Sequence, residues 1–246
     1  MSLPVHWVPS LTDVSVGSSV EVSGDEAHHA VAVRRLRVGE SVVLTDGRGR
    51  SVTGPVASTG KRAFSLEVAS VLDTDAPEPE VTVVQAIPKG DRGELAVEVL
   101  TEVGVARIVP WAASRSVAVW KGERAEKSLA RWRTTAREAS KQARRSWFAE
   151  VAPMATTVDV VALVASADLA VVLHEDATAP LAGVRVPAVG SVVVVVGPEG
   201  GLSDDEVARY EAAGAHAVRL GSEVLRTSTA GVAAVSALLS RTPRWR

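Results

Sequence analysis

The chain has 246 residues, of which 46% are hydrophobic and 23% charged, with a net charge of −2 and no cysteine. These values are ordinary for one large or two small globular domains, exclude disulfides and thiolate metal sites, and argue against non-specific coating of nucleic acid. The N-terminus has no signal-peptide pattern, and no apolar run reaches the roughly 20 residues of a membrane span. We therefore expect a cytoplasmic protein with no membrane association.

Residues 1–72 carry short apolar segments separated by turns rich in glycine, serine and aspartate. This pattern predicts a small β-barrel or sandwich. One helix is expected from Asp25 to Leu36, with Asp25 as its N-cap. Basic side chains on and just after this helix would ordinarily form a solvated face: His29, Arg34, Arg35 and Arg37.

Residues 73–80 (DTDAPEPE) contain two prolines and four acidic residues. Such a composition predicts a linker, so we expect one domain at 1–72 and a second at 81–246.

Predicted strands and helices alternate from Val81 onward, which is typical of a parallel sheet with helices on both faces. A first helix should begin with Asp91 and Glu94 as caps and end near Gly104. Further helices are expected at 123–145 and 158–166, and strands at 81–86, 106–111, 168–175, 191–196 and 216–221.

The long helix at 123–145 has a basic stripe, because four of its cations fall within about 80° on a helical wheel. Two interpretations remain open, a solvated face or a surface that binds phosphates. We favour contact with RNA, since like charges in one stripe repel each other without a partner. The four residues are Arg133, Arg137, Lys141 and Arg144.

Residues 191–201 (SVVVVVGPEGG) predict a strand buried on both sides that ends in a glycine-rich turn. Ser203 and Glu206 have the spacing of a capping box, so a helix should begin at Ser203. The carboxyl end of such a strand is where α/β sheets bind ligands. Because the turn is not GxGxxG and Glu199 would repel phosphate, a neutral or cationic ligand is expected.

The segment 229–240 contains no charged residue, which predicts a helix buried in the core or at a subunit interface. Thr227 and Thr229 are candidate caps of this helix. Arg226 precedes it, and a cation beside a buried element is expected to be paired or used. The five histidines lack metal-ligand spacing, so no metal site is predicted.

The pair of motifs GPEGGLSDDEV and, about twenty residues later, LGSEVLRTSTA resembles the ribosomal RNA small subunit methyltransferase E family. Its usual forms are GPEGGF(S/T)xxE and LGxRILRTETA. The chain departs at Ser222, Glu223 and Ser228, where the family has proline, arginine and glutamate. The resemblance covers nearly the whole chain, and HHAVAVRRLR is similar to a family region in the N-terminal domain.

The resemblance implies an α/β fold: a knotted (SPOUT-class, trefoil-knot) methyltransferase domain with a parallel sheet, preceded by a PUA-like β-barrel that contacts RNA. It implies methylation of N3 of a uridine in 16S rRNA of the small ribosomal subunit, with S-adenosylmethionine as cofactor, and a homodimer. The cofactor is then expected at Leu173, His174, Glu175, Val196, Gly197, Pro198, Glu199, Gly200, Gly201, Leu220, Gly221, Ser222, Leu225, Thr227 and Thr229. RNA contacts are expected at His29, Arg34, Arg35, Arg37, Lys89, Arg92, Arg133, Arg137, Lys141 and Arg144.

Arg226 is the candidate catalytic residue, because a fixed cation would stabilise negative charge on the uracil oxygens as the N3 proton leaves. Alternatively, Arg226 pairs with Glu199 or Glu223 and only holds the loops. The proton acceptor stays open among His174, Glu175 and Glu199. Other functions in view are a catalytically silent RNA-binding paralogue, for which the departures at 222–223 and 228 speak, an enzyme acting on another RNA, and a nucleotide-dependent enzyme, which lacks its phosphate motif.

Overall fold

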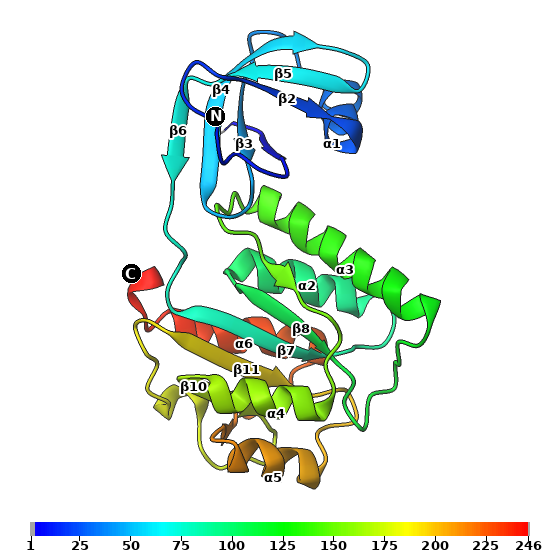
Figure 1. The fold of residues 1–246 in the computed structure, drawn as a ribbon. Coiled ribbons are helices and arrows are strands. Elements are labelled where there is room, and N and C mark those ends of the chain that lie inside the picture. Colours follow the sequence, from blue (N-terminus) through cyan, green and yellow to red (C-terminus); the bar gives the residue numbers. More distant parts are fainter. Residues whose placement is uncertain (1–2, 246) are drawn as a thin grey trace. The chain divides into compact units, whose positions relative to one another are not determined.

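The computed structural model describes residues 3–245 and divides into two compact units (Figure 1). One unit holds the N-terminal residues up to Ala76 together with Lys141–Phe148, and the other holds Pro77–Ser140 and the chain from Ala149 onward. Among the described residues, no helix is long and apolar enough to cross a membrane.

The first unit is a six-stranded sheet of mostly antiparallel strands around a small apolar core. The strands β1 (Val5–Trp7), β3 (Ser41–Thr45), β4 (Arg50–Thr59), β5 (Ala63–Glu67) and β2 (Ser19–Ser23) lie in this order, and β6 (Ser70–Asp73) pairs with β4. Leu11, Leu44, Phe64 and Leu66 are fully buried in its core. The predicted small β-domain is confirmed.

The predicted helix from Asp25 to Leu36 is shorter and consists of two parts. Helix α1 (Gly24–His28) has Ser23 as its N-cap and continues as a π-helical turn (His29–Val33). The expectation that Asp25 caps the helix was wrong, because its carboxylate is instead bound by Arg62. Arg35 has a φ of 56°, a conformation that cannot continue a helix.

The segment Lys141–Phe148, which the predicted limits place in the domain at 81–246, belongs to the first unit. Its backbone continues the hydrogen bonding of that unit: Phe148 N donates to Gly47 O at 2.9 Å, and Gly49 N donates to Ser146 O at 2.9 Å. The Trp147 indole donates to Thr74 O at 2.8 Å. The two partners in each of these bonds are more than 70 residues apart in sequence, so composition alone could not reveal the bonds.

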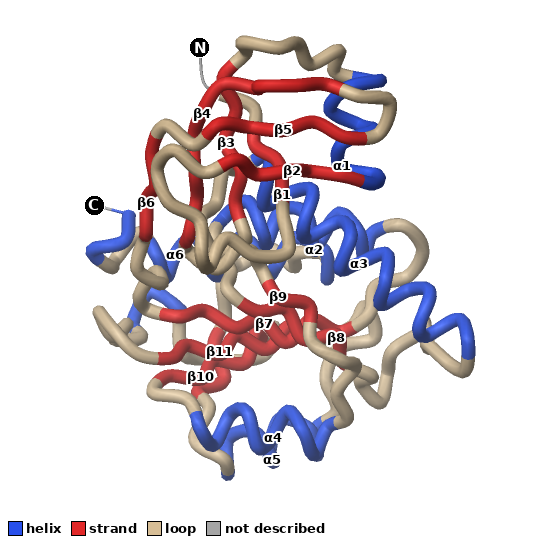
Figure 2. Tube along the Cα trace, turned by 45° about the horizontal axis from the view of Figure 1, so that its top comes forward, coloured by secondary structure: helices blue, strands red, loops and turns tan. Residues whose placement is uncertain are grey.

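The second unit contains a parallel sheet in the order β12-β10-β11-β7-β8-β9. Its strands are β7 (Glu80–Ala86), β8 (Arg107–Trp111), β9 (Glu150–Val151), β10 (Leu169–Leu173), β11 (Ser191–Val196) and β12 (His216–Val218). Its helices are α2 (Arg92–Val103), α3 (Glu123–Gln142), α4 (Thr157–Ser166), α5 (Asp204–Ala212) and α6 (Thr227–Leu239), with 3₁₀ turns at Leu181–Gly183 and Pro243–Trp245. Helices α2, α3 and α6 pack on one face of the sheet and α4 and α5 on the other (Figures 1 and 2), which confirms the predicted α/β class.

The central strands β11 and β7 are buried almost throughout, as the run of five valines predicts. Helix α6 is buried against α2, β7 and β11 within the same unit. Its lack of charge therefore reflects a core position, and its composition no longer argues for a subunit interface.

Two local expectations about helix ends were wrong, and a third was confirmed in position only. Helix α3 ends at Gln142, not Arg145, and Arg144 has a φ of 53°, so Arg144 lies outside the helical stripe. Asp91 is at the N-cap of α2 without a side-chain bond. The N-cap of α6 is Arg226, and Thr229 Oγ1 donates to the Arg226 carbonyl at 3.3 Å instead of capping a backbone N–H.

Candidate functional site

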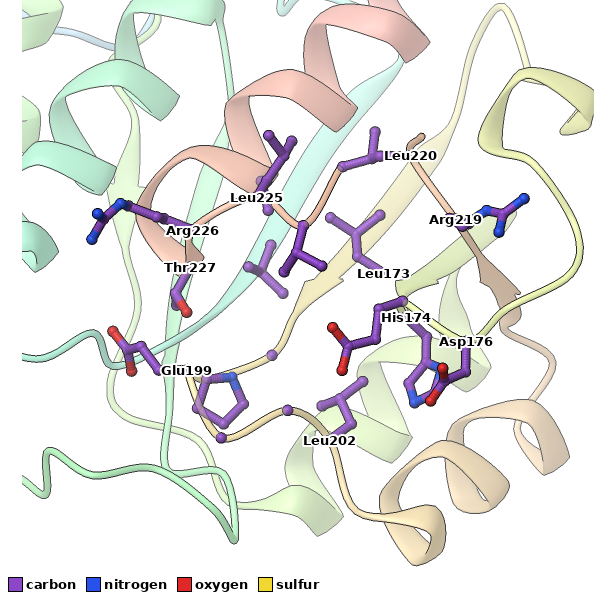
Figure 3. A pocket seen from close by; sticks show the side chains of 18 of the residues that line it. Leu173, His174, Asp176, Glu199, Leu202, Arg219, Leu220, Leu225, Arg226 and Thr227 are labelled. Carbon is purple, nitrogen blue, oxygen red and sulfur yellow. The ribbon is translucent and has the colours of Figure 1, made fainter. Parts of the chain in front are cut away.

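A cavity of about 480 Å³ opens at the carboxyl ends of β10, β11 and β12 within the second unit (Figure 3). Three segments supply most of its wall: Leu173–Asp176, Val196–Leu202 and Arg219–Ser228. Because all strands of this sheet run parallel, their carboxyl ends share one edge, and the loops that follow them meet there.

The turn after β11 packs so closely on its neighbours that glycine is needed at several of its positions. A Cβ at Gly197 would lie 3.0 Å from the Leu202 side chain, and one at Gly200 would lie 3.0 Å from the Arg115 carbonyl oxygen. Gly201 has a φ of 72°, which other residues rarely adopt. The turn is also tied to the β7–α2 loop, since Lys89 N donates to Glu199 Oε1 at 3.2 Å.

The helix that follows this turn begins with the predicted capping box. Ser203 Oγ accepts from Glu206 N at 3.3 Å, and Glu206 Oε2 accepts from Ser203 N at 3.0 Å. The carboxylate accepts a second backbone bond at Oε1, from Ser114 N at 2.8 Å. Burial alone would raise the pKa of Glu206, but the hydrogen bonds from Ser203 and Ser114 outweigh burial, so the pKa is lowered and the carboxylate stays charged.

The loop between β12 and α6 places Arg226 at the rim of the cavity. Gln85, fully buried at the end of β7, donates from Nε2 to the Thr227 carbonyl at 3.1 Å and so fixes the start of α6. In Figure 3 the exposed Arg226 side chain points away from the centre of the cavity, on the same side as Glu199. No ion pair joins Arg226 to Glu199, Glu223 or any other acid among residues 3–245.

Of the residues predicted to bind the cofactor, all except Thr229 line the cavity. The Thr229 hydroxyl instead donates to the Arg226 carbonyl, three residues earlier in the chain. Arg92, predicted as an RNA contact, also lines the cavity. Sequence reasoning missed further lining residues, although several adjoin the motifs: Arg115, Asp176, Leu202, Asp204, Arg219, Glu223, Val224, Ser228 and Ala230.

The residues predicted to contact RNA have different environments. His29, Arg34, Arg35 and Arg37 are exposed in the first unit, and Lys89 and Arg92 are exposed in the second. The basic stripe of α3 is not continuous, because Arg133 Nε is bound to Val151 O at 3.1 Å, Arg137 lies 3.8 Å from Glu138, and Lys141 is 10% exposed and ion-paired. The stripe interpretation therefore fails at Lys141 and Arg144.

The partner of Lys141 is Glu26, also in the first unit. Lys141 Nζ lies 2.9 Å from Glu26 Oε2, and His6 Nδ1 lies 3.2 Å from Glu26 Oε1. Burial would raise the pKa of Glu26, but hydrogen bonds and charges of His6 and Lys141 outweigh it and lower the pKa from 4.5 to about 2. Lys141 thus compensates a half-buried acid within the unit.

Two known domain families match this chain and define its class. The RNA methyltransferase domain family matches residues 75–239, and the RNA methyltransferase PUA domain family matches residues 22–69. The chain is an RNA methyltransferase of the PUA-containing kind.

The particular family follows from individual relatives. Ribosomal RNA small subunit methyltransferase E of Mycobacterium bovis is 42% identical over 98% of this chain and 93% of its own. The Bacillus subtilis protein of the same name is 28% identical, with 90% of each chain covered. The structure of the Neisseria gonorrhoeae protein of that name, bound to S-adenosyl methionine, superposes with a TM-score of 0.88 at 30% identity and covers 97% of this chain and 98% of its own. This chain belongs to the ribosomal RNA small subunit methyltransferase E family, as the paired motifs predicted.

Proposed function

We propose that this protein transfers a methyl group from S-adenosylmethionine to N3 of a uridine in 16S rRNA of the small ribosomal subunit. The observation that carries the proposal is the meeting of both family motifs, GPEGG and LRTSTA, at one cavity. Support comes from the relatives, whose names include ribosomal RNA of the small subunit, and from a similar structure that contains S-adenosyl methionine.

The residues around the cavity fit this cofactor. A Cβ at Gly197 or Gly200 would press on Leu202 or Arg115, so these glycines keep the turn in the shape that lines the cavity. Leu173, Leu220 and Leu225 give an apolar wall suited to adenine, while Glu175 and Glu199 suit a cationic ligand. S-adenosylmethionine would supply an activated methyl on a sulfonium, so the chain must bind the donor, orient the base and remove the N3 proton.

In this proposal Arg226 stabilises the negative charge that develops on the uracil oxygens. Its guanidinium has no acidic partner among the described residues, which favours this role over a loop-holding ion pair with Glu199 or Glu223. The proton acceptor would be one of three residues at the cavity: His174, Glu175 or Glu199.

RNA contacts are proposed for the predicted basic residues other than Lys141, whose ammonium pairs with Glu26. These are His29, Arg34, Arg35, Arg37, Lys89 and Arg92, and with them Arg133, Arg137 and Arg144, but no longer Lys141. A substrate in the ribosome supports a cytoplasmic location, which is part of this proposal. A homodimer is proposed on the family resemblance alone, and light scattering would test it, since a monomer would contradict it.

The test is transfer of labelled methyl from S-adenosylmethionine to small ribosomal subunits that lack the native modification, with naked rRNA and tRNA alongside. Nucleoside analysis should find 3-methyluridine in 16S rRNA. Label in tRNA or on a ribose oxygen would overturn the substrate. Cofactor binding without any transfer would favour a silent RNA-binding paralogue.

Replacing Arg226 separates its two roles. Arg226→Ala and Arg226→Lys should abolish transfer while the affinity for S-adenosylmethionine, measured by calorimetry, stays within about twofold of the unmodified protein. A large loss of cofactor affinity would assign Arg226 to holding the loops. Arg185→Ala, an exposed arginine of the same unit outside the cavity, is the matched control.

A further inference from the structure

The loop after β8, residues 112–122, supplies a wall of the cavity through Arg115. Its backbone is fastened on both sides of that residue: Ser114 N donates to Glu206 Oε1 at 2.8 Å, and Ser116 N donates to Ala113 O at 3.1 Å. The loop therefore presents Arg115 from a fixed backbone.

The carboxylate of Glu206 connects this loop to the turn after β11. The residue is 2% exposed, and its Oε2 accepts from both the backbone N and the Oγ of Ser203, at 3.0 and 3.1 Å. With Oε1 bound to Ser114 N, both oxygens are satisfied. One buried carboxylate thus closes the capping box of α5 and holds the Arg115 loop beside it.

The Arg115 side chain is itself fixed. Its Nη1 donates to the Leu202 carbonyl at 2.9 Å, and its backbone oxygen lies against Gly200. Four arginines line the cavity, Arg92, Arg115, Arg219 and Arg226. Within residues 3–245 Arg115 is the one of these four with a side-chain hydrogen bond, and none of the four has a carboxylate partner. Arg115 is therefore an oriented cation that lacks an anion.

We propose that Arg115 binds the carboxylate of the methionine moiety of S-adenosylmethionine and that Glu206 is the positioning residue that holds Arg115 in place. The proposal rests on the proposed function, since it deepens the cofactor site. Arginine has five N–H donors in a planar fork that matches a carboxylate, and one of them is used by Leu202. The remaining donors can bind the anion.

The proposal puts this carboxylate on the Arg115 side of the cavity. In Figure 3 Leu173, Leu220 and Leu225 lie on one side of the cavity and Leu202 lies on the opposite side. If adenine packs on the three leucines, the amino-acid moiety is left to the Leu202 side, where the Leu202 carbonyl binds the Arg115 guanidinium. The remaining lining residues near the turn include acids, Glu199 and Asp204, which suit the ammonium and sulfonium but not the carboxylate.

The experiment compares S-adenosylmethionine with decarboxylated S-adenosylmethionine, which differs only in lacking the carboxylate. Calorimetry gives the ratio of their two dissociation constants for the unmodified protein and for Arg115→Met. The preference for the carboxylate-bearing ligand should fall about tenfold in Arg115→Met, as expected for loss of a charge-assisted hydrogen bond. Arg185→Met, outside the cavity, should leave the ratio unchanged.

Glu206→Gln should reduce the same ratio, because an amide cannot accept from Ser203 N and Ser114 N at once through both of its terminal atoms. The control is Glu211→Gln, on the exposed side of the same helix. If Arg115→Met does not fold, as judged by circular dichroism, Arg115→Lys takes its place and should retain only part of the preference, because lysine keeps the charge without the fork.

Several results would overturn the proposal. Equal weakening of both ligands would mean that Arg115 only packs the site. Unchanged affinities with a raised KM for the ribosomal substrate would assign Arg115 to an RNA phosphate. If the unmodified protein bound neither ligand, the proposed function would fail as well, whereas normal cofactor binding with an unchanged ratio in Arg115→Met refutes this inference alone.

Discussion

The carboxylate of Glu26 should make the first unit sensitive to acid, and Glu26→Gln should remove that sensitivity. Glu26 accepts bonds from His6, Lys141 and the backbone N of Trp7, and its pKa is lowered from 4.5 to about 2. Each pKa unit is worth about 1.4 kcal/mol, so ionisation of Glu26 contributes about 3 kcal/mol to the free energy of unfolding.

The lowered pKa of Glu26 determines how the free energy of unfolding depends on pH. Because the folded pKa lies below the unfolded value, the contribution is complete above pH 4.5 and is lost as the pH falls from 4.5 toward 2. By pH 3 about 2 kcal/mol of it should be gone. Both Glu26 and Lys141 side chains are less than one-fifth exposed, so solvent screening reduces this value little.

The assay is urea-induced unfolding of the unmodified protein and Glu26→Gln at several pH values between 7 and 3. The difference between their free energies of unfolding should be largest at pH 7 and shrink steadily below pH 4.5. Glu21→Gln, at an exposed position on β2, should show no such change. A difference between the two proteins that stays constant with pH, or no difference at pH 7, would refute the reasoning.

Substitutions at three further residues test individual contacts. Gly200→Ala should weaken cofactor binding at least about tenfold without unfolding the protein, because the new Cβ would lie 3.0 Å from the Arg115 carbonyl oxygen. In the control Gly183→Ala the nearest atom is 3.8 Å from the new Cβ, so this variant should bind the cofactor normally by calorimetry. Tyr210→Phe should change the free energy of unfolding by no more than about 1.5 kcal/mol, because it removes only the hydrogen bond between the Tyr210 hydroxyl and Thr157, whereas Tyr210→Ala should cost about 3–5 kcal/mol in urea unfolding through the cavity it leaves. Ser228→Ala should also alter stability by less than about 1 kcal/mol, since the Ser228 hydroxyl is buried without a partner in the described part of the chain; a larger loss in thermal unfolding would reveal an unrecognised bond.

Features set by neighbours in sequence were predictable. The Ser203–Glu206 capping box depends on two side chains three residues apart, and Gly104 ends α2 in the left-handed conformation expected of a glycine. The valine run of β11 is buried because it has no polar face. The parallel order then brings the strand ends to one edge, so most of the cavity wall could be predicted from the two motifs.

Features that depend on partners far apart in sequence could not be predicted. Lys141 has the spacing of a helical basic stripe, yet it neutralises Glu26, 115 residues away. Helix α3 ends at Gln142, and beyond it Ser146 and Phe148 bind Gly49 and Gly47 of the first unit. Arg115 lies outside both sequence motifs, so its position at the cavity could not be predicted either.

The sequence by itself determined the α/β class, the family and the segments that line the cavity, because these depend on local periodicity, capping and contiguous motifs. Only the tertiary structure decided which charges are already paired and which are oriented without a partner. Glu206 shows the reason: its spacing from Ser203 predicts a helix cap, but its bond to Ser114, 92 residues away, exists only once the parallel strands have placed the two loops side by side.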